Sequence, residues 1–566
     1  DVQQMLRDTP GVSVMIYDQI CATEKRRRPK RGPRKPDRVR VMINQAVCEG
    51  CGDCSVKSNC LSVEPVETDL GRKRRINQST CNTDLSCLRG FCPSFVTVKD
   101  AHFAAEDAPV LEADASGLAL PDLPPVAQPW NILFTGVGGT GVTTVAAVLA
   151  MAAHVDGNAA SSLDMTGLAQ KGGPVLSHLR FAKEPDMIST GRVPPASADV
   201  IIGCDLVVAA GGDAISLMDV GRTRVAANAD VTPTSEFIRD RSKTFESQML
   251  AARVKRQALE FGAIDAEALA IGYMNDAIYT NMIMVGYAWQ KGYVPITLRG
   301  LYRAIKLNGV KIEDNMKAFD VGRLAAAAPD RLQTVSDPRG DVKPMSLDEI
   351  IEDRAERLVA FQNKAYADKY RELVANVRAS EDAAGLGDAF TTAVAKYAFK
   401  LMAYKDEYEV ARLYSDGSFA QSVAAKFKGD YEIRHHLAPP LLAQRDPETG
   451  HLQKQEYGPW MMRAFSVLAK LKGLRGTAFD PFGRTAERRM ERRLITDYRG
   501  TIAAILPGLK AANLDLAVEI ASVPEGIRGY GHVKERHVAD AKASEAMLVD
   551  AFKAGKSRAP VFMAAE

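Results

Sequence analysis

Seven of the nine cysteines in this chain lie between Cys48 and Cys92, and this clustering constrains the fold more than any other feature. In a compartment that keeps thiols reduced, closely spaced cysteines indicate metal or cluster ligation rather than a disulfide framework. The other two, Cys21 and Cys204, lie outside the segment. We therefore expect one small cysteine-rich domain within a multidomain chain of 566 residues.

The first three cysteines have the spacing of a loop that binds a cubane cluster. Cys48, Cys51 and Cys54 are each separated by two residues, which lets three thiolates converge on one cluster. In two-cluster bacterial ferredoxins the fourth cysteine of each run is followed by proline and binds the other cluster. Because Cys92 precedes Pro93, we expect Cys92 to be the fourth ligand of a [4Fe-4S] cluster held by the first three cysteines.

A second iron-sulfur cluster is predicted from the remaining cysteines. Cys60, Cys81 and Cys87 supply three thiolates, and Asp84 stands where the middle cysteine of a second run would fall. An aspartate oxygen is a harder and weaker ligand to iron than a thiolate. The site is therefore expected to hold a [4Fe-4S] cluster with a labile corner at Asp84, or a [3Fe-4S] cluster. Leu61 stands where a ferredoxin has proline, so the run departs from the ferredoxin pattern.

A zinc ribbon is the alternative interpretation of these cysteines, because zinc thiolates also hold small modules together. The chain would then be a scaffold or nucleic-acid module, with the basic stretch from Lys25 to Lys35 as its contact surface. Colour and metal content separate the two hypotheses. An iron-sulfur protein is brown, whereas zinc thiolate is colourless.

Shifts in composition divide the first part of the chain. Residues 1–40 contain an apolar run, Val12 to Tyr17, that predicts a buried strand, followed by the basic stretch, which is interrupted by prolines and is therefore an extended connector. The cysteine-rich domain is expected at 41–102. A linker rich in proline and alanine is expected at 103–128.

The rest of the chain is predicted to form two larger domains. Apolar strands that alternate with helices at 129–335 indicate a parallel sheet covered on both faces, a doubly wound Rossmann-like α/β domain. From residue 346 to 566 the apolar positions follow a helical spacing, so a mainly helical C-terminal domain is expected. The predicted fold class is α/β multidomain, with a small α+β ferredoxin-like domain.

A glycine-rich loop follows the first strand of the α/β domain. Gly136, Gly138 and Gly141, with Gly139 between them, match the G-x-G-x-x-G pattern, and Asp164 follows roughly 20 residues later. One interpretation is a site for a nicotinamide or flavin dinucleotide, which would make the chain a dinucleotide-linked iron-sulfur oxidoreductase. The other is a tight turn between strand and helix that binds no nucleotide.

Two C-terminal segments, Lys405–Tyr414 and Gly476–Thr485, complete a set of features that also includes the cysteine runs, Gly136–Val142 and the second glycine loop at Gln170–Gly173. With these features the whole chain resembles the downstream portion of a large fused indolepyruvate ferredoxin oxidoreductase. The resemblance implies that residues 1–40 end a thiamine diphosphate domain and continue into the basic linker. It also implies two clusters in a ferredoxin-like domain, and a gamma domain at 129–335 without a nicotinamide site.

Members of this 2-oxoacid:ferredoxin oxidoreductase family decarboxylate a 2-oxoacid on thiamine diphosphate, pass electrons singly through iron-sulfur clusters to ferredoxin, and transfer the acyl group to coenzyme A. The resemblance therefore implies thiamine diphosphate and Mg in the complete enzyme, coenzyme A as co-substrate, ferredoxin as partner, and a homodimer. The Gly-Asp-Gly motif of thiamine domains is missing, and Gly211-Gly212-Asp213 is not one. We expect the catalytic thiamine residues in an upstream portion of the same enzyme, which leaves electron relay and scaffolding to this chain.

The composition argues against two kinds of partner. A net charge of +3 over 566 residues provides no overall field that would attract nucleic acid. Apolar stretches such as Met282–Trp289 fall far short of the roughly 20 residues that a membrane-spanning helix needs. The chain opens with Asp1 and shows no secretory leader, so we expect a cytoplasmic protein. An opening residue other than methionine also fits a portion of a longer polypeptide.

Overall fold

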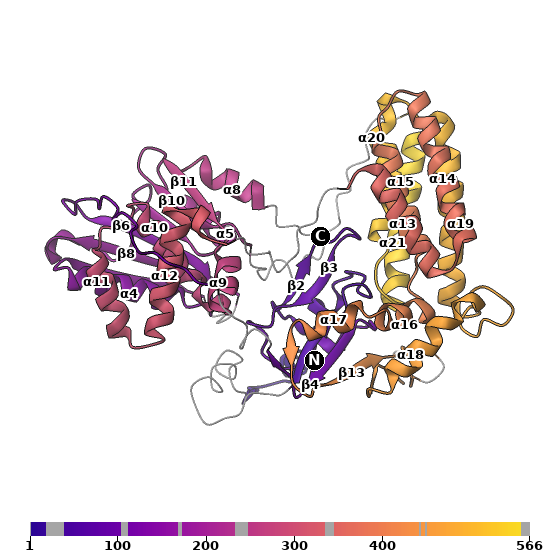
Figure 1. Ribbon diagram of the computed structural model, residues 1–566, viewed down its shortest axis with the longest axis horizontal. Helices are drawn as coiled ribbons and strands as arrows, with labels where there is room; N and C mark the ends of the chain where they lie inside the picture. Colours follow the sequence, from indigo (N-terminus) through magenta and orange to yellow (C-terminus); the bar gives the residue numbers. More distant parts are fainter. Residues whose placement is uncertain are drawn as a thin grey trace.

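The computed structural model describes residues 2–18, 39–103, 111–167, 172–231, 247–333, 345–440, 443–447 and 450–555. The chain is a mixed α/β protein: an α/β domain and a helical domain stand on either side of the cysteine-bearing part (Figure 1). The basic stretch Lys25–Lys35, Cys21 and Gln170–Lys171 lie outside the described residues. Among the described residues, no helix combines the length and the apolar character that crossing a bilayer requires.

The N-terminal segment does not contain the expected strand. Helix α1 (Val2–Asp8) is followed by residues 11–18 without regular structure. The prediction of a buried strand at Val12–Tyr17 is wrong, because Val12 is 99% exposed and Ile16 is 89% exposed. Alternating β-branched residues favour extended backbone, but a strand also needs a neighbour for its hydrogen bonds. No strand of the described chain pairs with this segment.

The cysteine-bearing part is built on a four-stranded antiparallel sheet with the order β1-β4-β13-β14. Strand β4 lies inside the sheet, and its Phe95, Val96 and Val98 are fully buried. A hairpin, β2-β3, and two short helices carry the loops between the cysteines. The elements are β1 (Val39–Ile43), α3 (Asp53–Ser58), β2 (Val63–Val66), β3 (Lys73–Ile76), η1 (Ser86–Arg89), β4 (Phe95–Lys99) and β5 (His102–Phe103).

Two strands of this sheet come from the C-terminal region, which the sequence pattern predicts to be mainly helical. Strand β13 (Glu432–Leu437) pairs with β4 and with β14 (Gln455–Tyr457). Strand β12 (Phe427–Lys428) pairs with β5. The cysteine-bearing part and the C-terminal region therefore share one sheet and one apolar core, which includes Val96, Tyr414 and Phe465.

The α/β domain contains a six-stranded sheet with the order β11-β10-β9-β6-β8-β7. The expected parallel arrangement holds for β6, β9, β10 and β11, but β8 runs antiparallel to both β6 and β7. Only a short connection joins β7 to β8, and a connection of that kind can link only antiparallel strands. The strands are β6 (Trp130–Val137), β7 (Ala159–Thr166), β8 (Pro174–Ala182), β9 (Val200–Gly203), β10 (Arg224–Asn228) and β11 (Glu260–Ile264).

Helices cover both faces of this sheet. Successive side chains of β6 point to opposite faces, so this strand contributes to an apolar core on each side. Ile132 and Phe134 pack into the larger core, and Leu133 and Val137 pack into the smaller one. The larger core is formed with α4 (Val142–Val155), α9 (Ala266–Met274), α10 (Thr280–Gln290), α11 (Leu298–Asn308) and α12 (Ile312–Ala327). The smaller core is formed with α5 (Leu206–Ala209), α6 (Gly212–Ile215) and α8 (Ser247–Lys255).

The C-terminal helices begin at a capping box, in which Ser346 and Glu349 satisfy each other's backbone amides at the start of α13. The helices are α13 (Leu347–Phe361), α14 (Lys364–Ala383), α15 (Ala389–Met402), α16 (Glu407–Ser415), α17 (Ser418–Ala424), α18 (Met461–Lys470), α19 (Ala486–Ile505), α20 (Leu514–Ser522) and α21 (Gly531–Lys553). Long helices of this set form the bundle at the right of Figure 1.

The two C-terminal sequence segments singled out above meet in space. Arg475, just before Gly476–Thr485, donates from Nε and Nη2 to the two oxygens of Asp406, at 2.6 and 2.8 Å. The Tyr408 hydroxyl donates to Asp480 Oδ1 at 3.2 Å. Buried polar contacts therefore hold the second segment against the start of α16.

Candidate functional site

Four cysteines line one cavity beside the four-stranded sheet. Cys48, Cys51, Cys54 and Cys92 all line the same small cavity. They come from the loop after β1, from α3 and from the turn before β4. Cys48 and Cys54 are buried, and the other two are partly buried. The structure thus brings together the four cysteines that the spacing assigns to the first cluster.

Two contacts hold the first loop of cysteines against the last. Asp53 Oδ2 accepts a hydrogen bond of 2.7 Å from the Phe91 amide. A Cβ at Gly90 would lie 2.7 Å from Cys54 Cα, so only glycine lets this turn approach α3. In addition, the Gly50 amide donates to Cys48 Sγ at 3.3 Å. The loop therefore directs a backbone N–H toward a sulfur atom.

The electrostatics of the cavity disfavour four bare thiolates. Burial, and then the neighbouring sulfurs Cys92, Cys51 and Cys48, raises the pKa of the Cys54 thiol well above its usual value. Burial and Cys92 also raise the pKa of Cys51. Thiolates here need a positive centre close by, which a bound metal supplies directly.

The donor set fits an iron-sulfur cluster. Thiolates are the usual ligands of such clusters, and three of these thiols have the matching spacing. Within the described part of the chain, no three His, Cys, Asp or Glu side chains converge closely enough to hold a single metal ion.

The second set of predicted ligands also shares one neighbourhood. Burial, and then Cys81, Cys60 and Asp84, raises the pKa of the Cys87 thiol to about 12. Asp84 itself is exposed, and its Oδ1 accepts hydrogen bonds from the Ser86 amide at 3.0 Å and from the Ser86 hydroxyl at 2.8 Å. One carboxylate oxygen of Asp84 therefore closes its own turn.

Backbone geometry around the second set is unusual. Asn59, Thr83 and Leu85 have φ values of 49°, 55° and 61°, and each lies within two residues of Cys60, Cys81 or Cys87. Non-glycine residues rarely adopt this left-handed region, least of all a β-branched residue such as Thr83. The Thr83 amide donates to Cys81 Sγ at 3.4 Å. Backbone strain of this kind is concentrated at ligand-binding and active sites. The sequence carries no signal for it.

The glycine loop of the α/β domain is held by the second glycine loop. The Gly138 amide donates to the Gly173 carbonyl at 2.7 Å, so it is not free to bind a phosphate. Asp164 lies on the outer strand β7, separated from β6 by β8. The structure therefore does not bring Asp164 beside the loop of Gly136 and Gly141, and this geometry favours the tight turn over the dinucleotide site.

The second glycine loop lies against the cysteine-bearing part. A Cβ at Gly172 would overlap the side chain of Leu61, the residue that follows Cys60. The loop thus makes a close approach to a side chain next to the second cysteine set. It brings the α/β domain up to that set.

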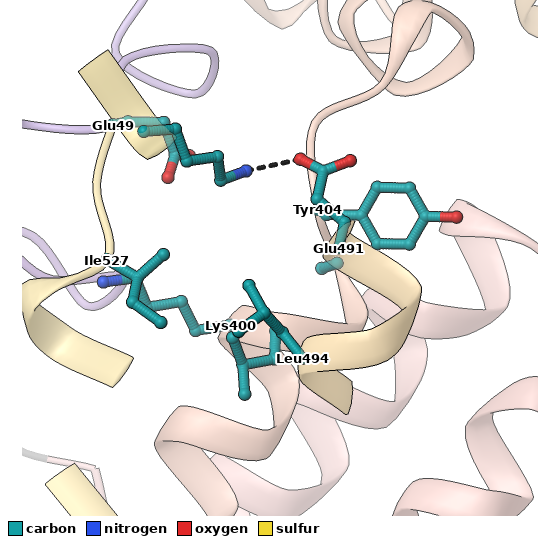
Figure 2. A pocket seen from close by; sticks show the side chains of 9 residues that line it. Glu49, Lys400, Tyr404, Glu491, Leu494 and Ile527 are labelled. Carbon is teal, nitrogen blue, oxygen red and sulfur yellow. Dashed lines mark hydrogen bonds and ion pairs between the residues drawn. The ribbon is translucent and has the colours of Figure 1, made fainter. Parts of the chain in front are cut away.

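A second small cavity is lined in part by Glu49, the residue that follows Cys48 (Figure 2). It is lined by Glu49, Lys400, Leu401, Ala403, Tyr404, Glu491, Leu494, Ile527 and Lys534. Burial alone would raise the pKa of Glu49, but Lys405, Lys73 and other lysines lower it to about 2. Burial lowers the pKa of Lys400 to about 7. Sequence reasoning missed this cavity, because its residues come from distant segments.

Most charges in this second cavity are already neutralised. Glu491 forms ion pairs with Lys534 and Arg488, and Glu49 forms one with Lys405. The Lys400 ammonium donates to the carbonyls of Pro524 and Glu525, at 2.7 and 2.8 Å. The cavity is therefore a buried charged junction between the cysteine loop and the C-terminal helices.

Two parts of the chain match known protein families. Residues 131–325 match the family described as pyruvate ferredoxin/flavodoxin oxidoreductase, and residues 347–546 match a family of unknown function, DUF6537. The indolepyruvate oxidoreductase subunit IorB of Pyrococcus horikoshii is 32% identical over 201 residues, which make up 35% of this chain and 96% of that subunit. The subunit of the same name from Thermococcus kodakarensis is 27% identical over 199 residues, with the same shares covered.

Solved structures are also similar to part of the chain. The gamma subunit of a keto/oxoacid ferredoxin oxidoreductase from Geobacter sulfurreducens is 19% identical, with a TM-score of 0.27, over 36% of this chain and 98% of that one. The sequence match to a relative that is 32% identical and almost fully covered carries the assignment. This chain belongs to the 2-oxoacid:ferredoxin oxidoreductase family.

Proposed function

We propose that this chain is the electron-transfer and scaffold portion of a thiamine-diphosphate-dependent 2-oxoacid:ferredoxin oxidoreductase. Its substrate is an aryl pyruvate such as indolepyruvate, and the products are acyl-CoA, CO2 and reduced ferredoxin. The observation that carries the proposal is the cavity lined by Cys48, Cys51, Cys54 and Cys92, in the same chain as a domain of this oxidoreductase family. The names of the IorB relatives support an aryl substrate.

In this proposal the chain supplies the ligands of two iron-sulfur clusters. Cys48, Cys51, Cys54 and Cys92 hold the first, a [4Fe-4S] cluster, and the second is held by Cys60, Cys81 and Cys87, with Asp84 at the fourth corner or with that corner empty. Such clusters, when bound, take up and release one electron at a time, which suits an oxidation of two electrons coupled to ferredoxin.

Cations of the chain stabilise negative charge at these sulfurs. Arg74 lines the first cavity, where burial lowers its pKa while Cys54 and Cys48 act in the opposite direction. Lys454 donates to the carbonyls of Gly90 and Cys92, and its electrostatic neighbours include Cys92 and Cys54 of the first set and Cys87 of the second. Its positive charge therefore acts on cysteines of both sets.

Thiamine diphosphate, Mg and coenzyme A belong to the complete enzyme in this proposal. The thiamine-binding residues are supplied by an upstream portion of the enzyme, which is the first partner of this chain, and ferredoxin is the second. The α/β domain is a scaffold, consistent with the engaged Gly138 amide. We further propose a cytoplasmic homodimer.

Metal analysis of the full chain, purified anaerobically, tests the proposal. We expect iron and acid-labile sulfide in amounts sufficient for two clusters, and an electron paramagnetic resonance signal that changes on reduction. Cys51→Ala is expected to lose the first signal. Cys204→Ala is the matched control, since Cys204 is a buried cysteine of the α/β domain and lies in neither set. Zinc without iron and sulfide would overturn the proposal.

Substrate class is tested separately with the thiamine-binding portion added. Ferredoxin reduction is compared with indolepyruvate, pyruvate and 2-oxoglutarate as substrates in the presence of coenzyme A. We expect the highest kcat/KM for indolepyruvate, and loss of ferredoxin reduction in Cys51→Ala. A preference for pyruvate would refute the aryl assignment and leave the cluster assignment standing.

A further inference from the structure

The domain that matches a family of unknown function reaches the first cysteine cavity through backbone carbonyls. Five of its residues donate to carbonyls beside the cysteines. They are Tyr530 to Val47 at 2.6 Å, Lys405 to Cys48 at 3.3 Å, Arg528 to Gly50 at 3.5 Å, Lys454 to Gly90 and Cys92 at 2.7 and 3.3 Å, and Tyr414 to Pro93 at 2.7 Å. All five donors lie within residues 347–546.

There is a physical reason why carbonyls are the point of contact. A loop that turns its amides toward sulfur, as Gly50 does toward Cys48, leaves its carbonyls on the outer side. Buried carbonyls need donors, because an unsatisfied one costs about 1–3 kcal/mol. The C-terminal domain supplies those donors on both loops that carry the cysteines of the first set.

Lys454 differs from the other donors in charge balance. Lys405 is paired with Glu49, and Arg528 is paired with Glu525. Lys454 forms no ion pair with a carboxylate of the described chain, and its ammonium lies 5.0 Å from the centre of the Phe95 ring. Its positive charge is therefore offset mainly by the cysteines Cys92, Cys54 and Cys87, with Asp53 as a weaker electrostatic neighbour.

Cysteine ligands carry negative charge into a buried site, and each added electron increases it. A cation held beside them stabilises the reduced state more than the oxidised state, and the effect is large where water is excluded. We propose that the C-terminal domain is a redox-tuning cover of the first cluster, in which Lys454 raises the reduction potential and the neutral donors hold the cysteine loops closed. This rests on the proposed function.

The test is a redox titration of the full chain, followed by electron paramagnetic resonance, with wild type, Lys454→Gln, Lys454→Arg and Tyr414→Phe. In Lys454→Gln we expect the equilibrium constant for reduction of the first cluster to fall at least tenfold, which is 59 mV for one electron. Lys454→Arg keeps the charge and should restore the wild-type potential. Tyr414→Phe removes only a neutral donor, so it should speed loss of iron to a chelator and leave the potential unchanged.

Lys472→Gln is the matched control. Lys472 donates to two backbone carbonyls, those of Val359 and Ala360, but its electrostatic neighbours are Arg412, Glu409 and Arg475 rather than cysteines. It should leave both the potential and the iron content unchanged.

The outcomes distinguish failure of the tuning role of Lys454 from failure of the proposed function. An unchanged potential in fully loaded Lys454→Gln, or equal shifts in Lys454→Gln and Tyr414→Phe, would overturn the tuning role. If Lys454→Gln loses its iron, a loaded Lys454→Arg with wild-type potential supports the role of the charge, and loss of iron in both contradicts it. Wild-type protein without iron and sulfide would sink the proposed function itself, and this inference with it.

Discussion

Thr97 Oγ1 and His436 Nε2 lie 3.1 Å apart and join β4 of the cysteine-bearing part to β13 of the C-terminal region. The adjacent His435 points to the other face of the sheet, where its ring lies 5.0 Å from that of Tyr414 and 5.3 Å from that of Phe465. Burial lowers the pKa of both histidines to about 4. The seam between the two parts of the chain therefore contains two neutral histidines.

Acid should weaken this seam. Histidine in an unfolded chain has a pKa near 6.5, so between pH 6.5 and pH 4 the unfolded chain binds protons that the native chain does not. The contribution of each histidine to the free energy of unfolding is expected to fall through this window by about 3 kcal/mol, and to change little below it. Urea unfolding at pH 7.0, 5.5 and 4.0, followed by near-UV circular dichroism, measures the change.

His435→Phe is the informative variant for this effect. Both ring nitrogens of His435 lack a hydrogen-bond partner among the described residues, so phenylalanine can fill the aromatic pocket without losing a bond. We expect the variant to lose less stability than wild type between pH 7.0 and pH 4.0. An equal loss in the two proteins would show that His435 does not contribute.

The buried ion pair of Arg475 and Asp406 should matter more than exposed pairs. Arg475→Met leaves Asp406 buried without its cation, and such a loss typically costs about 3–5 kcal/mol. Arg371→Met removes an exposed pair with Glu352 and is expected to cost less than about 1 kcal/mol. Chemical denaturation measures both, and similar values would contradict the assigned difference.

Two glycine substitutions should have opposite effects. Gly90→Ala places a Cβ 2.7 Å from Cys54 Cα, so backbone must move, and we expect a loss of about 1–3 kcal/mol together with a lower iron content. Gly500→Ala lies on the exposed side of α19 with nothing within 4 Å. It should stabilise the helix by about 0.5–1 kcal/mol and leave the iron content unchanged. Unchanged iron in Gly90→Ala would show that this turn does not shape the cysteine cavity.

Glu381 should be important for the helical bundle. It is fully buried, and its carboxylate accepts hydrogen bonds from the amides of Phe390 and Thr391, at 2.9 and 2.7 Å, at the start of α15. Glu381→Ala leaves both amides without an acceptor and is expected to cost about 2–4 kcal/mol. Glu381→Gln keeps one acceptor oxygen and should cost less. Thermal unfolding ranks the two variants, and the reverse order would contradict this role.

The cysteine sets could be foreseen because their ligands are local in sequence. Three of the first four cysteines lie within one short loop, and the structure places Cys92 with them. Asp84 shows the limit of spacing as a guide, since an aspartate two residues before a serine also forms an Asx turn, and Ser86 takes one of its oxygens. Asp84 thus fits both a cluster ligand and the first residue of an Asx turn, and its position in the sequence does not favour one over the other.

The shared sheet could not be foreseen, for a different reason. Strands β13 and β14 are short and stand among helices, so they leave little periodic signal. Their partners are set by contacts with a segment far away in sequence. The residues of the C-terminal domain that cover the cysteine loops, such as Lys454, are invisible to pattern analysis for the same reason. Strand direction in the α/β domain was only partly foreseen, because β7 and β8 form a hairpin within an alternating pattern.

The pairing of Thr97 with His436 also has a consequence during synthesis of the protein. These residues are 339 positions apart, and ribosomes add roughly 5–20 residues per second, so β4 waits tens of seconds for its neighbour. During that time the nascent cysteine segment has an open strand edge and uncovered sulfurs. Under the proposed function, iron would therefore be delivered after release of the finished polypeptide, when the C-terminal residues have covered the loops.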